Sequence, residues 1–128
     1  MSKPRHHQDR SQRHRRAQKR GRWAETLTAL YLRLTGHRVL ARNYKTQQGE
    51  IDLIVRRHTT ISFVEVKARA TRTLALEAIH PHQCRRIERA AEIFLARHPA
   101  LIHCGVRFDV ALVTGPFQVS VLQNAWRP

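Results

Sequence analysis

Residues 49–69 read GEIDLIVRRHTTISFVEVKAR, and the interpretation of the whole chain follows from this segment. Two apolar runs flank a short polar connection, which predicts a β-hairpin. Side chains alternate between the two faces of a strand. We therefore expect Glu50 and Asp52 to share one face of the first strand, with residues 51, 53 and 55 on the other. Glu65 and Lys67 are expected to share a face of the second strand.

The expected turn brings two carboxylates together. A turn centred between His58 and Thr59 places Asp52 directly opposite Glu65, with Cβ atoms about 4.5–5.5 Å apart. Like charges at that spacing destabilise a hairpin, so a compensating cation is needed. Mg²⁺ takes oxygen ligands from one or two carboxylates together with substrate phosphates. The pattern therefore predicts that Asp52 and Glu65 ligate Mg²⁺ (or Mn²⁺).

Lys67 follows Glu65 by two residues and is expected to reach the same pocket. Its ammonium could orient or deprotonate a water molecule, or stabilise charge that develops on a phosphate. Taken together, the two carboxylates and the lysine are typical of a site for phosphodiester hydrolysis.

The alternative is a pair of ordinary surface ion pairs, Glu50 with Lys67 and Asp52 beside Arg69, which are common and weak. Three apolar residues are expected on the same face as the carboxylates, which favours a covered site. They are Ile54, Ile61 and Phe63. The residues alone leave both interpretations open.

Residues 23–35 are predicted to form a helix that ends at Gly36. Five residues at helical spacing predict its buried face: Trp23, Leu27, Leu30, Tyr31 and Leu34. Glu25 lies on the flank, in a column with Ala29 and Leu32. It either belongs to the site or simply complements the dipole of the first helical turn.

The remaining patterns complete an α/β domain over residues 23–128. Strands are expected at residues 37–45, 105–113 and 117–122, and a second helix at residues 81–98, with Pro81 in its first turn. The inner face of this helix is predicted to consist of Gln83, Ile87, Ala90, Ala91 and Phe94. The result is a mixed sheet of about five strands flanked by helices. Arg107 and Asp109 share a strand face and are predicted to pair, and Trp126 is predicted to pack the chain end down.

Basic residues point to a polyanionic partner. The chain of 128 residues has a formal net charge of +15. Residues 1–22 contain nine basic residues and one acidic residue, so this segment is predicted to be a disordered basic tail that contacts phosphates, or else a solubilising extension. Arg69, Arg72, Arg85 and Arg86 are candidate nucleic-acid contacts, although ordinary solvated arginines are equally compatible with their positions.

Two further features bear on location. The two cysteines do not make a disulfide scaffold, so a reduced, cytoplasmic chain is expected. No apolar run approaches 18 residues, so no transmembrane helix is expected. A membrane is not among the expected partners.

The combination of GEIDLI, FVEVKAR, GRWAETLTALYL, RNY at residues 42–44, RFDVALV from Arg107 and NAW at residues 124–126 resembles the YraN-like family of small bacterial proteins. That family is similar to Holliday-junction resolvases of the PD-(D/E)xK superfamily, which implies a restriction-endonuclease-like fold. The resemblance implies that Asp52, Glu65 and Lys67 form the catalytic motif and that Glu25 completes the carboxylate set. Where the resemblance predicts a lysine after the proline of the second helix, this chain has Gln83.

The resemblance implies a nuclease acting on DNA, branched or structured, with a homodimer as one possible assembly. The alternative is a protein that retains the fold and binds nucleic acid through its basic surface without cutting it.

Overall fold

A computed structural model describes residues 21–128, so the predicted disordered tail lies almost entirely outside the described residues. The described chain forms a mixed five-stranded sheet with three α-helices, which is the predicted α/β, restriction-endonuclease-like architecture. The strands are β1 (Arg38–Lys45), β2 (Glu50–Arg57), β3 (Thr60–Ala68), β4 (Gly105–Gly115) and β5 (Gln118–Trp126). The helices are an N-terminal helix that covers residues 21–34, α2 (Arg72–Glu77), α3 (Pro81–Ala96) and the short 3₁₀ helix η1 (Pro99–Leu101).

The strands lie in the order β1-β2-β3-β4-β5. Neighbouring strands are antiparallel except for β3 and β4, which are parallel. In the central hairpin Leu53 pairs with Val64 and Arg57 pairs with Thr60, which is the predicted register.

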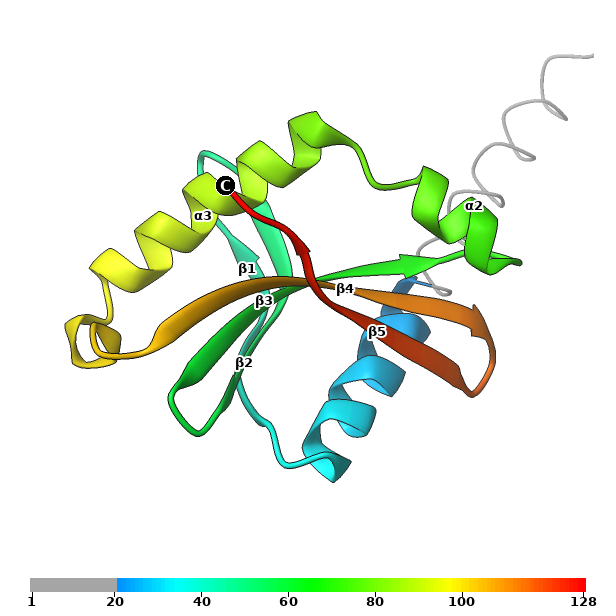
Figure 1. The fold of residues 1–128 in the computed structure, drawn as a ribbon, viewed down its shortest axis with the longest axis horizontal. Helices are drawn as coiled ribbons and strands as arrows, with labels where there is room; N and C mark the ends of the chain where they lie inside the picture. The colour runs from blue at the N-terminus through cyan, green and yellow to red at the C-terminus, as the bar shows by residue number, and fades with distance from the viewer. Residues whose placement is uncertain (1–20) are drawn as a thin grey trace, which may run out of the picture.

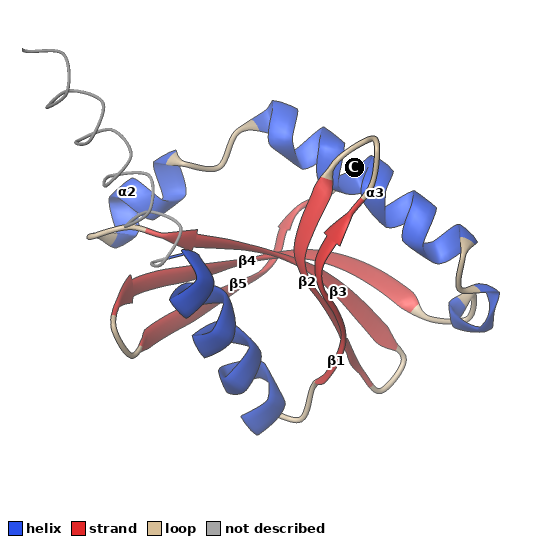
Figure 2. Cartoon of the chain, turned by 180° about the vertical axis from the view of Figure 1, so that it is seen from behind, coloured by secondary structure: helices blue, strands red, loops and turns tan. Residues whose placement is uncertain are grey.

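The helices cover both faces of the sheet (Figures 1 and 2). On one face, α3 places Ile87, Phe94 and its two buried alanines against Ile54 and Phe63, which confirms its predicted inner face. On the other face, the N-terminal helix packs Ala29 and Leu32 against Leu53, Val55 and Val64. The hairpin is therefore buried on both sides, as its apolar content requires.

The predicted buried face of the N-terminal helix was wrong. Trp23, Leu30, Tyr31 and Leu34 are exposed, Leu34 by 78%. The side turned to the sheet instead carries Ala24, Thr28, Ala29 and Leu32. Small residues on that side allow close packing on the sheet, and the Thr28 hydroxyl donates a hydrogen bond to the Ala24 carbonyl at 2.7 Å. The column through Ala29 and Leu32, which contains Glu25, is thus the buried one.

The segment after β3 contains the short helix α2, which the sequence did not predict. Thr71 caps it by accepting a hydrogen bond from the Leu74 N–H at 3.2 Å, and its buried Ala75 packs on Val110 and Leu112 of β4. At the end of β5, Trp126 stacks on Phe108 with ring centroids 5.3 Å apart, as predicted. Among the described residues no helix is long and apolar enough to span a bilayer.

Candidate active site

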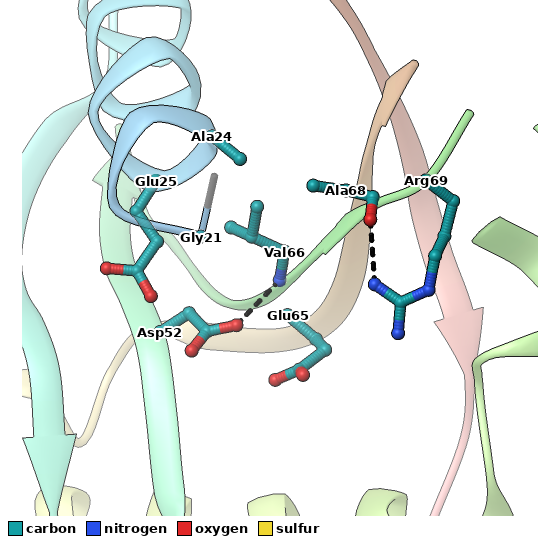
Figure 3. Close-up of a pocket in the computed structure, with 8 residues that line it drawn as sticks. All are labelled: Gly21, Ala24, Glu25, Asp52, Glu65, Val66, Ala68 and Arg69. Carbon is teal, nitrogen blue, oxygen red and sulfur yellow. Dashed lines mark hydrogen bonds between the residues drawn. The ribbon is translucent and has the colours of Figure 1, made fainter. Parts of the chain in front are cut away.

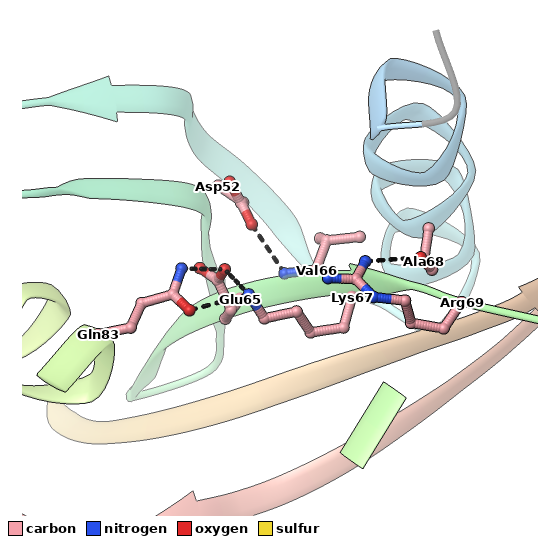
Figure 4. A network of polar contacts seen from close by, with 7 residues as sticks. All are labelled: Asp52, Glu65, Val66, Lys67, Ala68, Arg69 and Gln83. Carbon is pink, nitrogen blue, oxygen red and sulfur yellow. Dashed lines mark hydrogen bonds and ion pairs between the residues drawn. The ribbon is translucent and has the colours of Figure 1, made fainter. Parts of the chain in front are cut away.

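The site lies where β2 and β3 separate. Their ladder ends at the pair Leu53 and Val64, so Asp52 and Glu65 are the first residues beyond it. The main-chain N–H of Val66 donates to Oδ2 of Asp52 at 2.8 Å (Figure 4). A side-chain carboxylate has thus taken the place of a strand carbonyl, which satisfies a main-chain donor where the ladder opens.

At Asp52 the regular alternation of side chains along β2 is interrupted, so that Ile51 and Leu53, two residues apart, point to opposite faces of the sheet. In β1, Arg42 donates to the Thr26 hydroxyl of the N-terminal helix at 3.0 Å, whereas Tyr44 contacts Phe94 of α3. Asn43, between them, has φ +50°, outside the extended range of a regular strand. Opposite them in β2, Leu53 packs under the N-terminal helix, but Ile51 packs under α3. The prediction that Ile51 shares a face with Leu53 was therefore wrong.

Separation of the strands leaves a pocket of about 460 Å³ beside the first turn of the N-terminal helix (Figure 3). Glu25 reaches it from that helix, Asp52 from β2 and Glu65 from β3. The remaining lining residues are Gly21, Ala24, Val66, Ala68 and Arg69. Three of the four predicted catalytic residues thus line one cavity, which we call the acid pocket.

The carboxylates of the acid pocket are difficult to ionise, because they are largely buried and lie close to one another. Burial and repulsion from Glu65 raise the pKa of Asp52 from 3.8 to about 7, although the Val66 N–H opposes the shift. Burial also raises the pKa of Glu65, with the Lys67 ammonium acting against it. The pKa of Glu25 is raised by burial and by the charge of Asp52. At neutral pH the pair therefore binds a proton for part of the time, which is expected where like charges share one cavity.

Lys67 joins the site from the α3 side and does not line the acid pocket. Its Nζ lies 3.1 Å from Oε1 of Glu65 and donates to Oε1 of Gln83 at 2.8 Å. Gln83 in turn donates from Nε2 to Oε1 of Glu65 at 2.8 Å. The three side chains form a closed cycle (Figure 4). A glutamine suits this position because its amide supplies both a donor and an acceptor.

The donor set suits a divalent cation of the Mg²⁺ type. Asp52 and Glu65 supply hard oxygen ligands, and a double positive charge would remove the repulsion that raises the pKa of Asp52. Within residues 21–128, no group of three or more His, Cys, Asp and Glu side chains is arranged to hold a metal ion. In proteins Mg²⁺ is usually held by one or two carboxylates, with water and substrate phosphates as the other ligands.

The predicted nucleic-acid contacts are spread over the surface. Arg69 lines the acid pocket and donates to the Ala68 carbonyl at 2.7 Å. Arg72 donates to the Ser120 hydroxyl of β5 at 3.3 Å, and Arg86 donates to the Gln48 carbonyl at 3.2 Å. Arg85 is exposed on α3. Only Arg69 of these four lies at the carboxylates.

Two further features lie away from the carboxylates. Arg107 pairs with the buried Asp109 at 3.0 Å, as predicted. Gly49 precedes β2, and its φ is not positive. It is needed for close approach, because a Cβ there would lie 2.7 Å from the Arg86 carbonyl oxygen.

Comparisons with known proteins found relatives that match most of the chain. Residues 24–113 match the model of "Uncharacterised protein family UPF0102". A UPF0102 protein of Paramagnetospirillum magneticum is 49% identical over 121 residues, covering 91% of this chain and 94% of its own length. One of Parvibaculum lavamentivorans is 50% identical over 82% of this chain and 79% of its own length, and one of Agrobacterium fabrum is 44% identical over 80% and 84%. The chain therefore belongs to the UPF0102, YraN-like family.

Proposed function

We propose that this protein is a metal-dependent nuclease that hydrolyses phosphodiester bonds in structured DNA. The main support is the pair of carboxylates in the acid pocket, because Asp52 keeps a pKa of about 7 when no cation is bound. Carboxylates with pKa values raised this far are found chiefly at functional sites. Asp52 and Glu65 would hold the metal ion, which would supply charge neutralisation and Lewis acidity toward a phosphate.

The other residues have supporting roles in this proposal. Glu25, which reaches the acid pocket from the N-terminal helix, would accept a proton from water or orient it. The Lys67 ammonium is fixed by Glu65 and Gln83 at 3.1 and 2.8 Å. It holds the Glu65 carboxylate in place and provides positive charge behind it. Arg69 lies at the rim and contacts a phosphate of the bound strand.

Charge supports a nucleic-acid substrate. Residues 21–128 contain 16 of the 24 Lys and Arg residues and 8 of the 9 acidic residues, a net charge of +8 without the first twenty residues. A basic domain attracts a polyanion, and the metal ion lets a phosphate approach the acid pocket.

A binding protein without activity is the second candidate, and one observation favours it. The Lys67 ammonium does not line the acid pocket, whereas a catalytic lysine must reach the reacting groups. In that case the basic surface binds DNA and the carboxylates have no chemical role.

Cleavage of a DNA panel in Mg²⁺ and in Mn²⁺ tests the proposal. The panel contains a four-way junction, a gapped duplex, a flap and a fully paired duplex. The wild type is expected to cut at least one substrate, and Asp52→Asn and Glu65→Gln to abolish cutting while binding persists. Glu92→Gln, an exposed carboxylate of α3, is the control. Binding without cleavage of any substrate by the wild type would support the second candidate.

A further inference from the structure

A second pocket adjoins the acid pocket. It has a volume of about 340 Å³, within the range of small-molecule sites, and its exposed lining is mainly apolar. Trp23, Ala70, Val113 and Pro116 form much of its wall. We call it the tryptophan pocket. Its lining combines the start of the N-terminal helix, the exit from β3 and the turn between β4 and β5.

Trp23 is held in place without being covered. Its Nε1–H donates to the carbonyl of Pro116 at 2.8 Å, a contact between residues 93 positions apart. Phe117 packs edge-on against its indole, with centroids 5.9 Å apart and planes at 80°. The Trp23 residue nevertheless remains 47% exposed. A fixed and accessible aromatic side chain loses little conformational freedom when it binds a planar ligand.

The two pockets lie side by side and share part of their lining. Ala24, Ala68 and Arg69 line both of them, and all three residues are visible beside the carboxylates in Figure 3. One bound molecule can therefore occupy both pockets. Its apolar part would lie against Trp23 and its charged part at Arg69 and the carboxylates.

We infer that the tryptophan pocket binds an unpaired nucleobase of the DNA strand whose phosphate lies at the acid pocket. This rests on the proposed function and adds a substrate class, DNA with an unpaired nucleotide beside the scissile bond. A nucleobase fits the pocket because it has a planar apolar face for Trp23 and is tethered to a phosphate that Arg69 can contact. Base stacking on an aromatic side chain tolerates every sequence. A base inside a continuous duplex is stacked on its neighbours and is not free to enter.

The inference is tested by DNA binding with Ca²⁺ in place of Mg²⁺, so that a divalent cation balances the carboxylates, and only samples in which the DNA remains intact are compared. The ligands are a duplex with a three-nucleotide gap and the fully paired duplex of the same sequence. We expect Trp23→Ala to weaken binding of the gapped duplex by about 5- to 150-fold, the range for one stacked base, and to leave binding of the paired duplex unchanged. Trp23→Phe retains an aromatic ring and is expected to keep most of the preference for the gap.

Two controls separate stacking from a structural role. Leu34→Ala removes an apolar side chain of the same helix that is 78% exposed, and this variant is expected to preserve the gap preference. The fluorescence difference between wild type and Trp23→Phe isolates the emission of Trp23, because Trp126 is the only other tryptophan. Gapped DNA is expected to quench this emission.

The outcomes distinguish the inference from the proposed function. Equal loss of binding to both duplexes in Trp23→Ala, or no quenching by gapped DNA, would overturn the inference even if the wild type cleaves DNA. A gap preference that depends on Trp23 would support the inference even if no substrate is cut, and only the nuclease proposal would then fail.

Discussion

The carboxylate of Asp52 accepts a hydrogen bond from the main-chain N–H of Val66 at 2.8 Å. This contact fixes Asp52 at the point where the central hairpin opens and holds it next to Glu65. It also opposes the rise in the pKa of Asp52, but burial and the charge of Glu65 outweigh it.

Stability without metal should fall as the pH rises. The pKa of Asp52 is about 7 in the folded chain and 3.8 as the reference value for the unfolded chain, so the folded state binds more protons between these values. Its stabilising contribution is complete below pH 4 and is lost as the pH rises through 7. Asp52→Asn keeps an acceptor for Val66 and removes the charge. It should gain on the order of 2 kcal/mol at pH 8, measured by urea unfolding in EDTA.

At pH 4 the same variant should show little gain, and Glu92→Gln should show none at either pH. If Asp52→Asn were less stable than the wild type at pH 8, the carboxylate would not be strained in the free protein.

Metal binding should release a proton near neutral pH, because the cation binds the deprotonated carboxylate. Calorimetry with Mn²⁺ at pH 6.5, in two buffers of different ionisation enthalpy, should show heats that differ between the buffers. Proton release should fade, and affinity should increase, as the pH rises to 8.5. Identical heats in both buffers together with a pH-independent Kd would show that metal binding does not deprotonate Asp52, which would contradict its raised pKa.

Gln83 should hold Glu65 and Lys67 in position. Gln83→Leu removes a hydrogen bond to each and should cost about 1–3 kcal/mol of stability, because both partners are largely buried. Arg85→Ala, on the exposed side of the same helix, should cost less than about 0.5 kcal/mol. Chemical unfolding gives the free energy of unfolding of each variant. Equal losses in the two variants would mean that the cycle of Glu65, Lys67 and Gln83 does not contribute to stability.

Gly49 should tolerate no side chain. A Cβ there would lie 2.7 Å from the main-chain oxygen of Arg86, whereas at Gly105 the nearest atom would lie 3.9 Å away. Gly49→Ala should therefore cost about 1–3 kcal/mol through displacement of α3 from the loop before β2, and Gly105→Ala should cost much less. Thermal unfolding of both variants provides the comparison. Equal stability of the two would contradict the close packing described for Gly49.

Residues 1–20 should strengthen DNA binding through charge alone. They contain eight Lys and Arg residues, and each phosphate contact steepens the dependence of log Kobs on log salt by about 0.9. Replacing all eight with glutamine should flatten that slope by several units, while a scrambled tail of the same composition should keep it. A slope that the replacement leaves unchanged would exclude the tail from binding.

The hairpin could be predicted from sequence because its turn position and its two apolar patterns allow only one register, which Leu53 and Val64 confirm. Convergence of Asp52 and Glu65 followed from that register. The position of Ile51 under α3 could not be predicted from strict alternation, because the neighbouring strand departs from regular strand geometry at Asn43, whose φ is +50°.

For the N-terminal helix, the spacing of large apolar residues indicated the wrong buried face, and the reason is different. Its large apolar residues are exposed, and small residues such as Ala24 and Ala29 pack on the sheet. The cycle through Gln83 and the displacement of Lys67 from the acid pocket depend on how α3 sits over β3, which no local pattern encodes. The resemblance drew attention to Gln83 only as an absent lysine.

Anomalous diffraction from a crystal soaked in Mn²⁺ will show whether Asp52 and Glu65 bind one metal ion. We predict an anomalous peak within ligand distance of both Asp52 and Glu65, and no such peak in Asp52→Asn. A wild-type crystal with ordered carboxylates and no anomalous density between them, at a Mn²⁺ concentration that occupies other sites, would contradict this prediction.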